Sequence, residues 1–243
     1  MRKLSQLRNI RKYDVIFEML PLRGSGGFVT VLCNATPSRR DPMAHIQTQQ
    51  STITPDDVLS FWLDELTPKE WYVASDTLDA KIRDRFLPAW QKAQEGAFSF
   101  WLTHASGALA YIILNDQMPR NMFRGQGQSF ASDRIALAAA KISISKGWDM
   151  KIDTPARQFF YMPLMHSECL TDQERNVCLF KERMQSSDEN LLHAKAHRNV
   201  IREFGRFPYR NEMLGRASNV AEQAFLAKGG YRFAVERLTP VAA

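Results

Sequence analysis

The chain has 243 residues, and a hydrophobic content of 44% is enough to bury one sizeable core. Its formal net charge of +6 would suggest a nucleic-acid or acidic-membrane partner, but residues 1–42 hold 8 of the 32 basic and only 3 of the 26 acidic side chains. The rest of the chain, with 24 basic and 23 acidic groups, is nearly neutral, so we expect no nucleic-acid partner.

Residues 1–42 show neither helical periodicity nor strand alternation over a useful length. Glu18, Pro21 and Arg23 interrupt the apolar stretch near the start, whereas a secretory signal needs roughly 7–15 uninterrupted apolar residues. We interpret this segment as a basic, disordered N-terminal extension, followed by a flexible lead-in over residues 43–54. Three alternatives stay open: Met43 is the natural start of the protein, or the segment is an organelle-type basic arm or an authentic flexible tail.

Amphipathic helices are predicted from residue 54 onward. Thr54 is a good N-cap, Pro55 suits the first helical position, and Val58, Leu59 and Trp62 begin an apolar stripe. The same periodicity predicts helices within the segments 75–96, 100–115, 132–147, 154–162, 171–184, 187–205 and 221–230.

Two helix ends carry specific signals. Gly147 is a typical C-terminal stop, and Thr171 and Glu174 have the spacing of a capping box. The helical spacing of the large aromatic side chains indicates core positions rather than a stacking platform. These aromatic residues are Trp62, Trp71, Phe86, Trp90 and Trp101.

The predicted fold is therefore all-α. Short connections favour a single-domain antiparallel helical array over residues 55–228, with residues 229–243 as a C-terminal tail. Cys33, Cys169 and Cys178 form no C-x-x-C pair, which favours a reducing, cytoplasmic location. No stretch approaches the roughly 20 apolar residues of a membrane-spanning helix, so we expect no membrane partner. The sequence carries no signal for an oligomeric state.

Several ordered motifs resemble a known family. The segments "DQMPRNMFRG", "FFYMPLMHSE", "DQERNV", "FGRFPYRN" and "LGR" are similar, in this order, to the bacterial domain of unknown function 924 family, over residues 57–226. The resemblance implies an all-α fold like a tetratricopeptide-type superhelix, and it implies no reaction, because the family's activity is not established. The sequence departs from the family pattern at Cys169, and at "SNVAE" (218–222), where a weaker helix start is expected.

Arginines gather in the polar segments 115–125 and 197–216. A guanidinium offers a rigid fork of donors that matches a carboxylate or phosphate, so Arg120, Arg124, Arg206 and Arg210 predict a site between helices for a small anionic ligand or an acidic peptide. The alternative stays open that they tie helix ends together, since Asp116 and Arg120 have i, i+4 spacing. The predicted ligand-binding residues are Asp116, Gln117, Arg120, Asn121, Arg124, His197, Arg206, Arg210 and Asn211.

A second hypothesis is an enzyme that uses His166 and Glu168 as an acid–base pair on an anionic substrate, because a carboxylate can fix the tautomer of an imidazole. A zinc deaminase is excluded because no P-C-x-x-C follows the H-x-E. His193 and His197 have i, i+4 spacing without the Glu of H-E-x-x-H, so we expect no metal. No Walker or Rossmann pattern is present, and we expect no cofactor.

Overall fold

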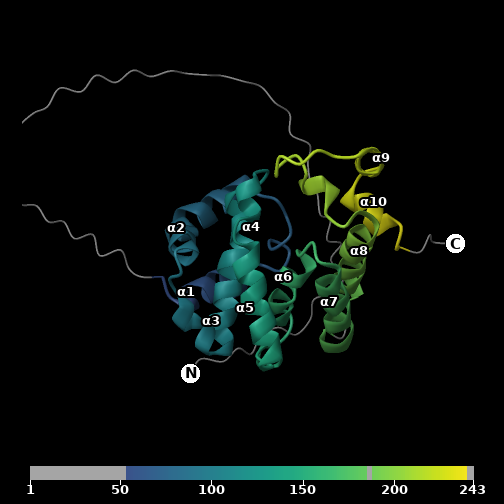
Figure 1. The fold of residues 1–243 in the computed structure, drawn as a ribbon. Helices are drawn as coiled ribbons and strands as arrows, with labels where there is room; N and C mark the ends of the chain where they lie inside the picture. Colours follow the sequence, from purple (N-terminus) through teal and green to yellow (C-terminus); the bar gives the residue numbers. More distant parts are fainter. Residues whose placement is uncertain (1–52, 185–187, 240–243) are drawn as a thin grey trace, which may run out of the picture.

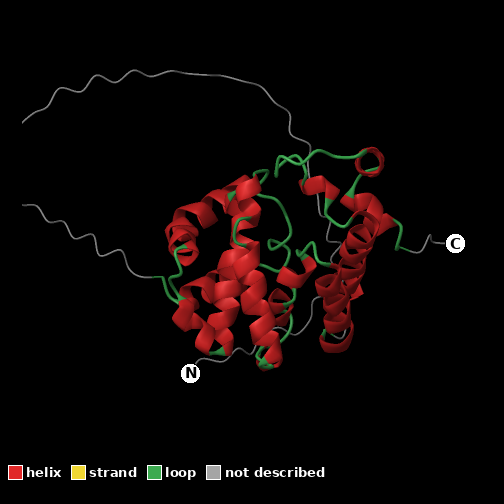
Figure 2. Ribbon diagram, viewed as in Figure 1, coloured by secondary structure: helices red, strands yellow, loops and turns green. Residues whose placement is uncertain are grey.

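The computed structural model describes residues 53–184 and 188–239 (Figure 1). The predicted N-terminal extension (1–42) and most of the lead-in (43–54) lie outside the described residues. Throughout the described ranges the regular elements are helices and no strand occurs, as Figure 2 shows. The all-α prediction is confirmed.

The first helix, α1 (Pro55–Leu59), begins where the sequence predicts. The Thr54 hydroxyl accepts a hydrogen bond from the Asp57 N–H at 3.3 Å, and the Asp57 carboxylate accepts one from the Thr54 N–H at 2.9 Å. These reciprocal bonds satisfy two donors that a helix start leaves unpaired, and Pro55 has no N–H to satisfy. Helix α1 continues into a π-helical turn, Ser60–Glu65.

A large core lies among α1, α2 (Asp76–Gln94), α3 (Ala105–Ile112), α5 (Asp133–Ser145), α6 (Met162–Met165) and α7 (Leu170–Arg183). Ile82, Phe86 and Trp90 of α2 are buried on one face, as their spacing predicts. Gly147 ends α5 with a φ of 67°, the left-handed conformation that glycine adopts without strain. Short 3₁₀ turns connect these helices at Ser99–Thr103, Gly127–Phe130, Asp149–Lys151 and Ala156–Phe160.

A smaller core lies among α8 (Asp188–Phe204), α9 (Val220–Ala227) and α10 (Tyr231–Glu236), at the end of the molecule away from α1 and α2 (Figure 1). Helix α10 falls in residues 229–243, which the sequence assigns to a C-terminal tail. Its Tyr231 and Ala234 are buried with Val200 of α8. The helical fold therefore extends past residue 228.

Two expectations about helix starts, a capping box at Thr171 and a weak start in "SNVAE", are wrong. Helix α7 begins at Leu170, after Cys169, so Thr171 lies inside its first turn and forms no capping box. Asn219, in the "SNVAE" segment where a weaker start was expected, accepts from the Glu222 N–H at 2.9 Å, while the Glu222 carboxylate accepts from the Asn219 N–H at 2.8 Å. Asparagine caps a helix as well as serine does, which explains the full capping box of α9.

Across the ranges that the structure covers, no helix combines the length and the apolar character that crossing a membrane requires.

Candidate functional site

Most of the polar segment 115–125 is helical: residues 115–122 belong to helical elements, and residues 123–125 form a turn. Helix α3 runs through a π-helical turn, Ile113–Gln117, into α4 (Met118–Met122). Pro119 has no N–H to donate to the carbonyl of Asn115, and that carbonyl instead accepts the Ser132 hydroxyl at 2.6 Å. The π-helical turn therefore places Asp116 at a buried position and Arg120 at a half-buried position of one continuous helix.

Asp116 is completely buried and contacts His166, 50 residues further along the chain. Nδ1 of His166 lies 2.9 and 3.0 Å from its two carboxylate oxygens, and the Gln117 amide donates to one of them. Burial raises the pKa of Asp116, but His166 and Arg120 outweigh this effect and hold that pKa below its usual value. The carboxylate is therefore ionised at neutral pH.

Both terminal nitrogens of Arg120 donate hydrogen bonds to neighbouring groups. Nη1 donates to the Asp116 carbonyl at 2.6 Å, and the guanidinium pairs with both carboxylate oxygens of Asp133, at 3.0 and 3.3 Å. Nη2 lies 3.7 Å from the Asp116 carboxylate. These bonds join α4 to α5 and fit the role of a structural tie.

Arg210, from the 3₁₀ turn Pro208–Arg210, is in a different situation. It is only 7% exposed, and its guanidinium lies between the rings of Phe130 and Phe207, 4.5 Å from each centroid. Nη1 donates to the His166 carbonyl at 3.1 Å and lies 3.5 Å from Asp133. Within the described chain, Nε and Nη2 donate no hydrogen bond. Burial and Arg120 lower the pKa of Arg210.

Two further side chains complete the site. Among the residues that the structure describes, the buried Tyr209 hydroxyl has no hydrogen-bond partner; burial raises its pKa, so it is a neutral donor. The His197 ring lies 6.5 Å from the His166 ring, and its Nδ1 bonds the His193 carbonyl at 2.9 Å. Burial lowers the pKa of His197 well below its usual value.

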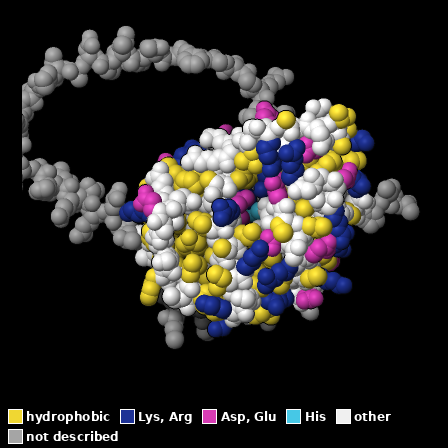
Figure 3. Space-filling model, viewed as in Figure 1, with side chains coloured by type: hydrophobic (Ala, Val, Ile, Leu, Met, Phe, Trp, Pro, Cys, Tyr) yellow, Lys and Arg dark blue, Asp and Glu magenta, His cyan; other side chains and the backbone are white. Residues whose placement is uncertain are grey.

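These contacts bring residues of the segments 115–125, 162–168 and 197–216 together in space. We call the following set the polar junction: Asp116, Arg120, Asp133, His166, Tyr209 and Arg210. In Figure 3, histidine atoms are visible near the middle of the face shown, with basic and acidic side chains beside them.

Glu168 does not pair with His166. Its carboxylate accepts hydrogen bonds from Nη1 and Nη2 of Arg216, at 2.7 and 2.9 Å, and from the Phe207 N–H at 2.9 Å. Burial raises the pKa of Glu168, but Arg216 and the Phe207 N–H outweigh this effect and lower it. The carboxylate that contacts His166 is Asp116, so the acid–base pair predicted from H-x-E is not formed.

Of the predicted ligand residues outside the polar junction, Gln117 and His197 lie beside it, and four others have partners elsewhere. Asn121 and Arg124 bind Asp79 of α2, with contacts of 2.6 to 2.9 Å. Arg206 makes a bidentate pair with Glu222 of α9, at 2.6 and 2.8 Å, and Asn211 bonds Ser218 at 3.0 Å. These residues tie helices together, which is the structural alternative left open by the sequence.

Two junction residues were not among the predicted site residues. Asp133 lies directly after the "SFAS" that follows the first motif, and Tyr209 lies inside "FGRFPYRN". The position of each residue in or next to an ordered motif is the signal that the sequence offers for it, because the contacts of Asp133 with Arg120 and Arg210 join residues distant in sequence.

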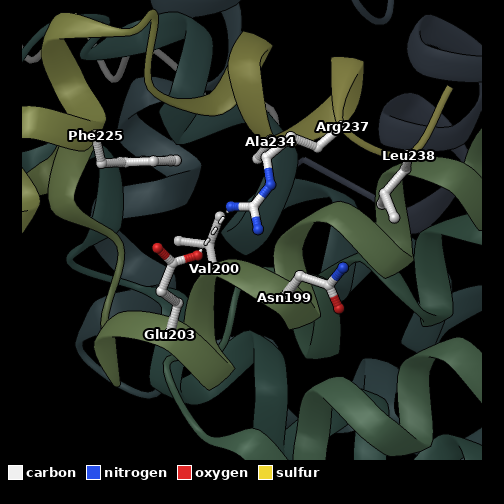
Figure 4. Close-up of a pocket in the computed structure, with 7 residues that line it drawn as sticks. All are labelled: Asn199, Val200, Glu203, Phe225, Ala234, Arg237 and Leu238. Carbon is white, nitrogen blue, oxygen red and sulfur yellow. Dashed lines mark hydrogen bonds and ion pairs between the residues drawn. The ribbon is translucent and has the colours of Figure 1, made fainter. Parts of the chain in front are cut away.

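A cavity of about 100 Å³ lies elsewhere, among α8, α9 and α10. Figure 4 shows Arg237 reaching toward Glu203 across it, and the two side chains pair at 3.1 Å. None of the predicted site residues lines this cavity. Among the residues described here, no three or more His, Cys, Asp or Glu side chains are grouped to hold a metal ion.

Comparison with known proteins gives a family and a fold relative. The family described as bacterial protein of unknown function (DUF924) matches residues 58–230, a range that contains the whole polar junction. The solved structure of the protein of unknown function ATU0120 from Agrobacterium tumefaciens is similar to this chain, with 34% sequence identity and a TM-score of 0.68. The similarity covers 72% of this chain and 97% of that one. No curated protein matches the chain.

Proposed function

We propose, for a chain that belongs to the bacterial DUF924 family of proteins of unknown function, that the polar junction binds a small carboxylate through Arg210. The family supplies no activity, so the proposal rests on the chemistry of the site itself.

The observation that carries the proposal is the incomplete hydrogen bonding of Arg210. Buried polar groups are nearly always paired, and a buried guanidinium with one hydrogen bond retains donors for a further acceptor. The unpartnered Tyr209 hydroxyl adds a second donor in the same junction. A carboxylate is planar and accepts two parallel N–H bonds from a guanidinium, which matches these unused donors.

The charge balance of the polar junction selects the class of anion. Arg120 and Arg210 are offset by Asp116 and Asp133, and the neighbouring Arg216–Glu168 pair is neutral as a whole. Because the junction has no excess positive charge, burying one negative charge beside Arg210 costs less free energy than burying the two charges of a phosphate dianion. A small monocarboxylate, or one carboxylate of a larger metabolite, fits this balance best.

Thermal melting of the full chain tests the proposal. We expect acetate or succinate to raise the melting temperature of the wild type above that in sodium chloride of equal ionic strength, by several degrees near saturation, since ligand at about 100 times Kd stabilises by about 2.7 kcal/mol. Arg210→Lys keeps the charge but loses the fork, so the shift should shrink strongly. Arg232→Lys, at a highly exposed arginine, is the matched control and should keep the shift.

The same melting experiment is repeated with phosphate and with a peptide that has a free C-terminal carboxylate. A shift with the peptide alone would identify a peptide site in place of a metabolite site. If every anion shifts the melting temperatures of wild type and Arg210→Lys by the same amount, or shifts neither, the binding proposal is wrong.

A further inference from the structure

The environment of His166 points beyond binding. Asp116, fully buried, holds Nδ1 of His166 with both oxygens within 3.0 Å. An ionised carboxylate is only an acceptor, so Nδ1 carries the proton and donates it to Asp116. The other ring nitrogen, Nε2, makes no hydrogen bond with any residue that the structure describes. His166 therefore presents an unshared electron pair, in the tautomer that a buried carboxylate fixes.

The charges around His166 keep this imidazole neutral. It is contacted by Asp116 of the π-helical turn, and it is influenced by Arg120 of α4 and Asp133 of α5. Burial and Arg120 lower the pKa of His166, and this lowering outweighs the opposite effect of the two carboxylates. Arg210 and His197, on the remaining sides, add one positive charge and a second imidazole whose pKa is also lowered. At neutral pH, His166 can accept a proton.

The donors left over in the polar junction are suited to a developing negative oxygen. The Tyr209 hydroxyl is buried, neutral and unpartnered, and the positive charges of Arg120 and Arg210 act on it. A preorganised donor of this kind stabilises an oxyanion more strongly in a water-poor site than water would. Tyr209 directly precedes Arg210 in the chain, and Arg210 bonds the His166 carbonyl at 3.1 Å, so the oxyanion donor and the base belong to the same junction.

We propose that Asp116 and His166 form an acid–base dyad that hydrolyses a small carboxylic ester bearing a second, negatively charged carboxylate; this rests on the carboxylate binding proposed for Arg210. Nε2 removes a proton from water as the water oxygen bonds to the ester carbonyl carbon. The Tyr209 hydroxyl holds the resulting oxyanion. The ester C–O bond then breaks, and Nε2–H returns the proton to the leaving alkoxide, which restores the neutral imidazole.

Water is the nucleophile because no suitable side chain is engaged with the base. The adjacent Ser167 hydroxyl donates to Asp172 at 2.9 Å instead of to the ring. Within the described ranges, no hydroxyl or thiol contacts Nε2, unlike in a triad where a serine bonds the imidazole.

The test uses mono-4-nitrophenyl succinate as the anionic ester and 4-nitrophenyl acetate as the neutral one, with release of nitrophenolate as the readout. We expect the wild type to favour the anionic ester and His166→Gln to lose about 100-fold or more of kcat, the usual contribution of a general base. Arg210→Lys should raise KM for the anionic ester only. His104→Gln, at an exposed histidine, should leave both rates unchanged. The kcat/KM of the wild type should rise with pH and level off once His166 is deprotonated.

A second measurement needs no folded variant. In wild-type protein labelled with ¹⁵N-histidine, His166 should be the neutral Nδ1–H tautomer at neutral pH, and succinate should shift its Nε2 signal. An Nε2–H tautomer would overturn the dyad. If succinate stabilises the wild type but the anionic ester is hydrolysed no faster than by His166→Gln, the dyad proposal is wrong and carboxylate binding stands. If succinate neither stabilises the protein nor shifts the Nε2 signal, both proposals are overturned.

Discussion

Arg120 and Arg210 share Asp133 as a partner, yet their remaining bonds differ. Arg120 has a backbone carbonyl and both oxygens of Asp133 as acceptors, and Asp116 is close by. Arg210 has one carbonyl, and two aromatic rings occupy the faces of its guanidinium. A buried arginine held by stacking is well fixed in position while its N–H edge stays available, which is the arrangement expected of a ligand contact.

Substitution by lysine should separate the two roles. Arg120→Lys leaves Asp133 and the Asp116 carbonyl short of donors, so we expect the free energy of unfolding to fall by about 1–3 kcal/mol. Arg210→Lys removes one hydrogen bond and should cost less, roughly 1 kcal/mol. Urea unfolding of both variants without added carboxylate measures this difference. A larger loss for Arg210→Lys would show that Arg210, too, is primarily structural.

The sequence could place these arginines in polar segments, but it could not show which of them pair with acidic residues and which keep donors for a ligand. The partner that satisfies a guanidinium is often far along the chain: Arg124 binds Asp79, and Arg206 binds Glu222. Spacing reveals only local pairs, and the i, i+4 pair of Asp116 and Arg120 is real but long, at 3.7 Å. The contact of Asp116 with His166 depends on the packing of two helices and leaves no signal in spacing.

At the scale of elements, the N-terminus of α9 is both capped and bonded to the segment that follows α8. Asn219 and Glu222 form its capping box, and the same Glu222 carboxylate holds Arg206, just after the end of α8. Arg206 lowers the pKa of Glu222 to about 2, against the opposing effect of burial. One acidic side chain therefore caps α9 and attaches it to α8.

Removing the cap should loosen α9 selectively. Asn219→Ala should cost about 1 kcal/mol, and amides of α9 should exchange with solvent faster while those of α3 do not change. Ser145→Ala, an exposed position at the end of α5, is a neutral comparison. Equal acceleration in α3 would mean that α9 unfolds only together with the large core.

Helix α8 should make stability depend on pH. His193 and His197, with His166 beside them, have pKa values lowered by burial, so they stay neutral in the folded chain below pH 6.5 while the unfolded chain takes up protons. Stability is therefore complete above pH 6.5 and is lost as the pH falls below it, by up to about 1.4 kcal/mol per pH unit for each histidine. The carboxylates with lowered pKa, such as Glu222, lose their contribution only below about pH 4.5.

Urea unfolding between pH 7.5 and pH 5 checks this slope. His197→Phe should keep its packing against Tyr231 and flatten the slope by one histidine, and His104→Gln should not change it. If His197→Phe does not change how the free energy of unfolding depends on pH, groups other than His197 take up the protons.

The elements themselves were largely predictable, because apolar periodicity fixes which segments become helices. The start of α1 and the end of α5 followed from Thr54 and Gly147. Thr171 does not cap α7, because the helix already begins at Leu170, one residue before the predicted cap. The helix at 115–122 was missed because a proline and polar residues usually signal a loop, whereas here Ser132 satisfies the carbonyl that Pro119 leaves unpaired.

At the scale of the whole molecule, the polar junction joins two cores. Asp116, Arg120 and His166 come from elements packed on the large core, while Tyr209 and Arg210 belong to the turn that follows α8, beside the small core (Figure 1). Phe207, which stacks on Arg210, is itself part of the small core. A ligand at the junction would contact both parts at once.

Native-state hydrogen exchange can detect this connection. The small core has fewer buried side chains, so α9 and α10 should open at a lower free energy than α3 and α5. Opening would withdraw Arg210 from the junction, so a bound carboxylate should slow exchange in α9 and α10 by the factor 1 + [L]/Kd. Amides of α3 that exchange through local openings should not respond. Arg210→Lys should abolish the slowing, and Arg232→Lys should preserve it. Protection that rises only in α3 and α5, with α9 and α10 unaffected, would show that the ligand contacts the large core alone and that Arg210 takes no part in holding it.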